Sequence, residues 1–97
     1  MEKVSQEQIE LWKKKHGNVF QIDVDGRTCY LRKPNRKELS YAAVASKNDP
    51  LKYNEVILKS CWLGGDEEIR TDDDLFLSAG AVLGDIIETK AAELKKL

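Results

Sequence analysis

Apolar and polar residues alternate on both sides of an Asp-Gly pair, Asp25-Gly26. Such a pair between alternating segments is the strongest short-range signal for a two-residue type I′ turn, so residues 18–33 are predicted to form a β-hairpin. The turn sets a register in which one face of the hairpin is apolar, with Phe20, Ile22, Val24, Cys29 and Leu31. The other face is expected to be largely hydrated and carries Gln21, Asp23, Thr28, Tyr30 and Arg32.

The segments on either side of the hairpin carry the start signals of helices. Ser5 and Gln8 occupy capping-box positions for a first helix over residues 5–16. Asn35, with a glutamate three residues later, opens a second helix over residues 35–47 in the same way. Because a two-stranded hairpin is hardly stable alone in water, its apolar face is expected to be covered by helices.

The second half of the chain is also mostly helical in pattern. Asp49 followed by Pro50 predicts the start of a third helix, over residues 49–63, whose apolar residues cover more than one face and make it the expected central helix. An acidic loop is predicted over residues 64–71, followed by a helical region over residues 72–97. The last part of that region carries a heptad-like apolar stripe, which either packs on the core or stays exposed for a partner: Leu83, Ile86, Ile87, Ala91, Leu94 and Leu97.

Together these elements predict an α+β fold, in which a two-stranded antiparallel β-hairpin packs against a bundle of four to five helices. The length of 97 residues favours a single domain, 1–97, with one modest core. The short first helix is expected to dock on the rest through Trp12. No apolar run approaches the roughly 18–20 residues that span a bilayer, and the N-terminal residues lack the apolar segment of a signal peptide. We therefore expect a cytoplasmic protein.

Few residues occur in patterns that support catalysis or metal binding. His16 is the only histidine, and neither Cys29 nor Cys61 has a metal-ligand spacing to it, so both cysteines are expected to be reduced thiols in the core. The acidic residues between 66 and 74 lack the ligand spacing of a calcium loop. No phosphate-binding glycine loop or nucleophile elbow is visible. We predict no enzyme activity, no cofactor and no metal; catalysis by carboxylates alone leaves no such pattern and stays an open alternative.

One group of charges departs from the pattern of the rest of the chain. The basic turn, defined as Arg32, Lys33, Arg36 and Lys37, brackets the start of the second helix. Arg36 and Lys37 fall in the first turn of that helix, where the helix dipole disfavours cations by roughly 0.3 kcal/mol or more each. Three interpretations are open: a solvated surface neutralised by Glu38 and other acids, contact with an acidic protein partner, or contact with nucleic acid. Nucleic acid is disfavoured because the net charge is −1 and Tyr30 is the only aromatic residue nearby.

Four short motifs occur in order along the chain: YLRKP at the end of the hairpin, NRKEL at the start of the second helix, CWLGG at the end of the third, and GAVLGDIIETKAAEL in the last. With the initial helix, this order resembles the small tail assembly chaperones of tailed bacteriophages. The resemblance implies a non-enzymatic protein that binds the tape-measure protein, the tail tube protein or both in the bacterial host cell. Binding would keep these partners soluble until the tail polymerises. The resemblance implies no catalytic residue.

A protein of this kind needs apolar or mixed binding surface with a charged rim that selects its partners. We therefore predict a partner-binding site made by the basic turn together with the last helix, through Ile86, Ile87 and Leu94. No small-molecule substrate and no membrane contact are expected. Two other functions compete with this one: a different structural phage component, such as a head–tail connector or minor tail protein, and a small regulatory module that binds nucleic acid.

Overall fold

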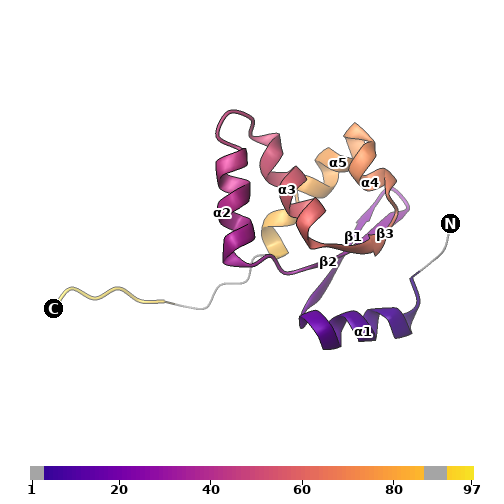
Figure 1. Cartoon of the computed structure of the whole chain (residues 1–97), viewed down its shortest axis with the longest axis horizontal. Coiled ribbons are helices and arrows are strands. Elements are labelled where there is room, and N and C mark those ends of the chain that lie inside the picture. The colour runs from indigo at the N-terminus through magenta and orange to yellow at the C-terminus, as the bar shows by residue number, and fades with distance from the viewer. Residues whose placement is uncertain (1–3, 87–91) are drawn as a thin grey trace.

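The structure is a computed structural model that describes residues 4–86 and 92–97. Figure 1 shows a small sheet with helices around it, so the described part of the chain is mixed α+β. The elements in chain order are α1 (Gln6–His16), β1 (Val19–Val24), β2 (Arg27–Arg32), α2 (Arg36–Ala45), α3 (Leu51–Cys61), β3 (Trp62–Gly65), α4 (Glu68–Thr71), α5 (Asp73–Gly80) and the 3-10 helix η1 (Leu83–Ile86). No helix among these residues is both long enough and apolar enough to cross a membrane.

The starts of α1 and α2 follow the predicted caps. The Ser5 hydroxyl accepts a hydrogen bond from the Gln8 backbone N–H at 3.1 Å and begins α1. In α2 the capping box is complete, because the Asn35 side chain accepts from the Glu38 N–H and the Glu38 carboxylate accepts from the Asn35 N–H. These bonds satisfy N–H groups that a helix otherwise leaves without partners at its first turn.

The hairpin has the predicted register. Strand β1 pairs antiparallel with β2, and Ile22 faces Cys29 across the ladder. At the turn, Asp25 and Gly26 have φ angles of 47° and 77°. A type I′ turn requires positive φ at both positions, which glycine adopts freely and aspartate tolerates. The Asp-Gly pair therefore determines which residues of the two strands share a face.

Residues 62–65 form a third strand, whereas the sequence predicted the end of a helix followed by a loop. Helix α3 ends at Cys61, and the chain continues directly into β3, which pairs antiparallel with β2. The strand order is β1-β2-β3, so β2 is the central strand. The segment WLGG is too short for its alternation to be seen in the sequence, and its two glycines resemble a helix stop.

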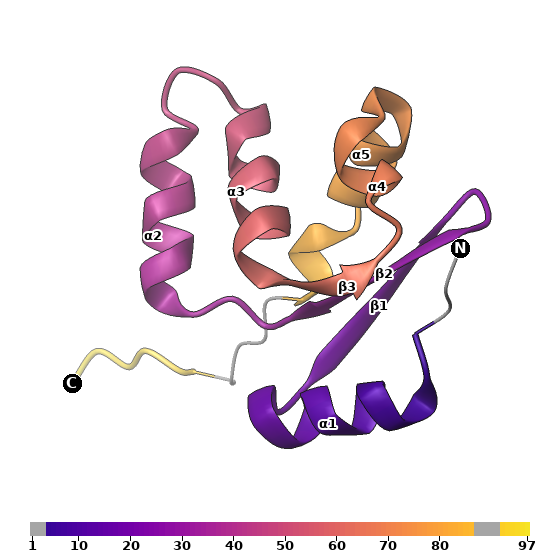
Figure 2. The same cartoon turned by 45° about the vertical axis from the view of Figure 1, so that its right-hand side comes forward.

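The apolar face of the sheet is covered by helices that come later in the chain, as Figure 2 shows. Ile22, Cys29 and Leu31 are buried on this side, where α3, α4 and α5 contact the strands. Helix α3 contributes Ile57, Leu58 and Cys61 to the core, in agreement with its predicted central position. The remaining core residues come from α2, α4, α5 and η1: Ala42, Ile69, Ala79 and Leu83.

The opposite face of the sheet is covered in part by α1, although it was predicted to be largely hydrated. The ring of Trp12 lies 5.6 Å from the ring of Tyr30 between centroids. It also lies against Gly64, where an added β-carbon would come within 3.0 Å of the indole. Helix α1 therefore docks through Trp12, as predicted, but onto the polar side of the sheet, and helices lie on both faces (Figure 2).

The predicted acidic loop, residues 64–71, is partly regular structure. After β3 it contains α4, whose Ile69 is fully buried. The Arg70 guanidinium lies over the ring of Trp62, 4.2 Å from its centroid, and this contact holds α4 to β3. One apolar residue among acids was too weak a pattern to predict this helix.

The predicted long final helix is absent from the described residues. Helix α5 ends at Gly80, η1 is a single turn, and residues 92–97 have no regular structure. Leu83 is buried, whereas Leu94 is fully exposed, so these two residues of the predicted stripe do not share one environment. Gly80 and Gly84 lower the helix propensity of this segment by about 1 kcal/mol each relative to alanine. Ile87 and Ala91 lie outside the described residues.

Candidate functional site

The basic turn divides into a structural residue and surface residues. Arg32 donates from Nη1 and Nη2 to the two carboxylate oxygens of Glu38, at 2.8 and 2.5 Å. Its Nη2 also donates to the backbone oxygen of Ser60 at 2.7 Å. The guanidinium therefore connects the end of β2 to the first turn of α2 and the last turn of α3. Arg32 was predicted as a partner-binding residue, but its donors are used inside the fold.

The Arg32–Glu38 pair also changes the pKa values of both groups. The hydrogen bond from Arg32 is the main reason that the pKa of the Glu38 carboxyl lies below its ordinary value of 4.5, and the Asn35 N–H acts in the same direction. The hydrogen bond to Glu38 raises the pKa of Arg32. Because the folded-state pKa of Glu38 is lowered, its contribution to stability is fully present above pH 4.5. It is lost as the pH falls through the lowered pKa.

The lowered pKa of Glu38 predicts that the stability of the protein and that of its Glu38→Gln variant respond differently to acid. The variant is expected to be less stable near neutral pH, because the amide accepts a weaker hydrogen bond from Arg32 than the carboxylate does. The difference in unfolding free energy between the protein and the variant should narrow as the pH falls below about 4.5, where Glu38 becomes protonated in the unfolded chain. Urea unfolding at about pH 7 and about pH 3 measures this difference in free energy at each pH. An equal difference in unfolding free energy at both pH values would contradict the pH-dependent contribution of Glu38. Glu55→Gln is the matched exposed control.

The other members of the basic turn lie on the surface. Lys33, Arg36 and Lys37 are exposed. The side chains of Arg36 and Lys37 form no ion pair with any residue that the structure describes. The carboxylate of Glu38, which was predicted to neutralise the basic turn, already forms an ion pair with Arg32. Glu38 therefore neutralises the charge of Arg32, whereas the charges of Arg36 and Lys37 face solvent.

Large apolar side chains follow the same exposed side of α2. Tyr41 and Val44 are 67% and 74% exposed, whereas Ala42 is fully buried. Lys37, Tyr41 and Val44 are spaced at i, i+4 and i+7, which places them along one side of the helix. Sequence reasoning missed this surface, because apolar residues of an amphipathic helix are expected to face the core. The signal that could have shown it is that α2 has more apolar residues than one buried stripe needs.

A groove lies between α2 and α3, which run side by side in Figures 1 and 2. Its volume is about 670 Å³. The helix α2 contributes Tyr41 and Ala45, and α3 contributes Val56 and a mixed charged rim. The α2–α3 groove is defined by all of its lining residues: Tyr41, Ala45, Lys52, Glu55, Val56, Lys59 and Ser60.

The predicted apolar half of the site is not assembled with the basic turn. Ile86 is the last residue of η1, and Ile87 lies outside the described residues. Leu94 is fully exposed in a segment without regular structure. The described residues therefore show no helical face that joins Leu94 to the basic turn, and the exposed apolar residues of α2 take that position instead.

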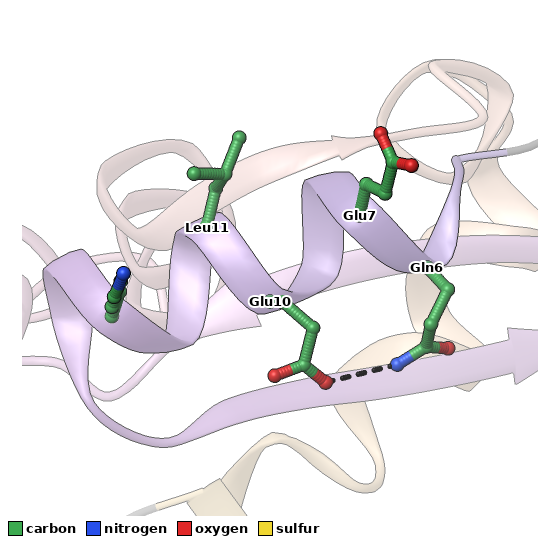
Figure 3. Close-up of a pocket in the computed structure, with 5 residues that line it drawn as sticks. Gln6, Glu7, Glu10 and Leu11 are labelled. Atoms are coloured by element: carbon green, nitrogen blue, oxygen red, sulfur yellow. Dashed lines mark hydrogen bonds between the residues drawn. The ribbon is translucent and has the colours of Figure 1, made fainter.

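A second hollow lies on the outer side of α1 and has a volume of about 540 Å³. Figure 3 shows Leu11 and Glu7 projecting from one side of the helix, while Gln6 donates a hydrogen bond to Glu10 at 3.1 Å on another. Leu11 is the only apolar residue among the described residues that line it, and it is 60% exposed. Its described lining comes from one helix, whereas two helices line the α2–α3 groove.

The two cysteines lie in the core as free thiols, in β2 and α3. Desolvation raises the pKa of Cys29 and of Cys61 to about 11. Both thiols are therefore protonated at neutral pH, and a protonated thiol is a weak nucleophile. Among the described residues, no group of three or more histidines, cysteines, aspartates or glutamates could hold a metal ion.

Comparison with known proteins found no matching family model, no matching curated protein and no matching solved structure. Function is therefore inferred from the motifs of the chain and from the surface of α2 and α3.

Proposed function

We propose that this protein is a non-enzymatic tail assembly chaperone that binds the tape-measure protein, the tail tube protein or both before the phage tail polymerises. The observation that carries the proposal is the outer surface of α2. There, Tyr41 and Val44 are mostly exposed beside the cations Arg36 and Lys37, which have no described partner. Exposed aromatic and aliphatic side chains with a charged rim are typical of surfaces that bind proteins.

The motif resemblance supports the same proposal from a different direction. The YLRKP and NRKEL motifs supply Arg32, Asn35 and Glu38, which hold the start of α2 against β2 and α3. The motifs thus contain both the residues that position α2 and the cations that it exposes. A protein that keeps a client soluble needs such a surface held in a defined orientation, since ordering it only on binding would weaken the complex.

Co-expression tests the proposal directly. The cognate tape-measure protein is expected to gain soluble yield when the two are co-expressed, and to co-purify with this chain. Unchanged yield without co-purification would contradict the proposal. Presence of this chain in purified virions would instead favour a connector or minor tail protein, and strongly salt-dependent retention on DNA would favour a nucleic-acid-binding module.

Charge reversal at the start of α2 should separate binding from folding. The double variant Arg36→Glu/Lys37→Glu is expected to weaken the complex about tenfold or more, because it replaces cations at the rim with anions. The fold should be unaffected or slightly stabilised, since acidic residues are favoured in the first turn of a helix by roughly 0.3–1 kcal/mol each. Pull-down titration measures the complex, and thermal unfolding measures the fold.

The matched control for this variant is Lys14→Glu/Lys15→Glu, which makes the same charge change on exposed lysines of α1. It should leave the complex intact. If both double variants weaken the complex equally, net charge and not the surface of α2 controls binding. Loss of folding in the α2 variant would show that its cations are structural.

A further inference from the structure

The α2–α3 groove has the dimensions of a site for one further helix. The ten residues of α2 span about 15 Å. Two neighbouring helices present a furrow in which a third helix seats its side chains at i, i+3 or i+4, and i+7. On the apolar side of this furrow are Tyr41, Ala45 and Val56.

The charges around the groove are unevenly distributed. Lys52 at one end is paired with Glu55 at 3.3 Å. Arg36 and Lys37 lie at the start of α2, and Lys59 lies close to the end of α3. These two helix ends adjoin, because Arg32 joins Glu38 of α2 to Ser60 of α3.

The end of the groove near Ser60 is therefore cationic. Within the part of the chain that the structure describes, Arg36, Lys37 and Lys59 have no ion-pair partner. Since the whole chain has a net charge of −1, this is a local feature and not a consequence of a basic composition. An anionic group bound at this end would meet Lys59, which lines the groove, and Lys37, one helical turn before Tyr41, without displacing an existing pair.

We propose that the α2–α3 groove binds an acidic amphipathic helix of the client protein. Apolar residues of that helix contact Tyr41, Ala45 and Val56, and its acidic residues lie at the cationic end of the groove. The inference rests on the proposed function and specifies which kind of client segment is recognised. Nucleic acid matches the groove less closely, because Tyr41 is the only aromatic residue for base stacking among its described lining residues.

A designed peptide tests the groove without knowledge of the client. The probe is a fluorescein-labelled peptide of about 14 residues, with leucines at i, i+3, i+4 and i+7 and glutamates on the remaining helical face. A matched peptide carries lysine at each glutamate position. Fluorescence anisotropy with the full chain should show binding of the glutamate peptide at least about tenfold tighter than that of the lysine peptide, and the difference should shrink at about 0.5 M salt.

Variants of the groove identify where the probe binds. Tyr41→Ala and Lys37→Glu/Lys59→Glu are each expected to weaken binding of the glutamate peptide about tenfold or more. All three residues are exposed, so circular dichroism and thermal unfolding should show an intact fold. Lys14→Glu/Lys15→Glu on α1 is the matched control and should bind the probe with little change. If Lys37→Glu/Lys59→Glu fails to fold, Lys37→Ala/Lys59→Ala removes the same cations.

Three results would overturn the proposal. The first is equal affinity for the two peptides, or no effect of the groove variants. The second is tighter binding of a single-stranded oligonucleotide of about 20 nucleotides that the same variants abolish, which would assign the groove to nucleic acid. The third is concentration-dependent self-association lost in Lys37→Glu/Lys59→Glu, which would assign it to a second copy of this chain.

Failure of the proposed function has a different signature. If Tyr41→Ala and Lys37→Glu/Lys59→Glu still keep the tape-measure protein soluble, the groove inference is wrong and the chaperone function stands. If the glutamate peptide binds the groove but no tape-measure or tail tube protein is retained, the client assignment is wrong and the recognition of acidic helices stands.

Discussion

Gly65→Ala is expected to destabilise the protein by about 3 kcal/mol or more, and to lower its melting temperature by roughly 12 °C or more. Gly65 has a φ of 119°, a conformation that residues with a β-carbon rarely adopt. A β-carbon there would lie 2.4 Å from the carbonyl oxygen of Thr28 and 2.6 Å from the α-carbon of Cys29. Both are backbone atoms of the central strand and cannot rotate away.

The same displacement would disturb the hydrogen bonds next to Gly65. The Asp66 N–H donates to the Thr28 oxygen at 2.8 Å, and the Thr28 N–H donates to the Asp66 carboxylate at 3.0 Å. These bonds fix the end of β3 against β2. Moving β3 outward by the width of a methyl group would therefore break the pairing as well as strain the backbone. Urea unfolding and thermal unfolding measure the loss.

Gly26→Ala is the matched control. Gly26 has a positive φ of 77°, but an added β-carbon would meet no atom within 4 Å. This variant carries the conformational cost alone, about 1 kcal/mol. If Gly65→Ala costs no more than Gly26→Ala, the close approach of β3 to β2 does not limit the stability of the sheet.

Arg32→Ala is expected to cost about 2 kcal/mol, with a fall in melting temperature of roughly 8–16 °C. The side chains of Arg32 and Glu38 are 24% and 19% exposed, so removing the arginine leaves a carboxylate that solvent reaches only in part. It also removes the donor to the Ser60 oxygen at the end of α3. The loss should exceed that of an ordinary surface ion pair, which contributes about 1 kcal/mol or less.

Two comparisons make the Arg32 prediction specific. Arg36→Ala, on the exposed side of the basic turn, should change stability by about 0.5 kcal/mol or less. Arg32→Lys keeps the charge but cannot bond both carboxylate oxygens and Ser60 in one plane, so it should recover only part of the loss. Equal effects of Arg32→Ala and Arg36→Ala would show that the whole basic turn is solvated surface. A double-mutant cycle with Glu38→Ala measures the coupling between the pair.

Local features of the structure were predictable because their causes lie within a few residues. The Asp25-Gly26 turn determined the register of the hairpin, and the Ser5 and Asn35 caps located the starts of α1 and α2. Cys29 and Cys61 were placed in the core by the apolar pattern around them. In each case the deciding contact joins residues close in the sequence, so a pattern is enough to indicate it.

Features that depend on distant contacts were not predictable in the same way. The pairing of β3 with β2 joins Gly65 to Cys29, and nothing in either segment alone indicates it. The final apolar stripe was predicted to form a helix on helical periodicity, but its leucines at 83 and 94 lie in different environments. Periodicity shows that a helix could form, whereas a helix persists only where neighbouring elements bury its apolar side.

The candidate site shows the same division. The sequence alone identified the basic turn as an electrostatic exception, and it determined that Arg36 and Lys37 lie in the first turn of a capped helix. Only the tertiary structure decided that Arg32 belongs to the fold, because its bonds run from β2 to Glu38 of α2 and to Ser60 of α3. It likewise decided that Tyr41 and Val44 face solvent beside those cations. A sequence determines which side chains are charged or apolar, but packing decides which of them are left to bind a partner.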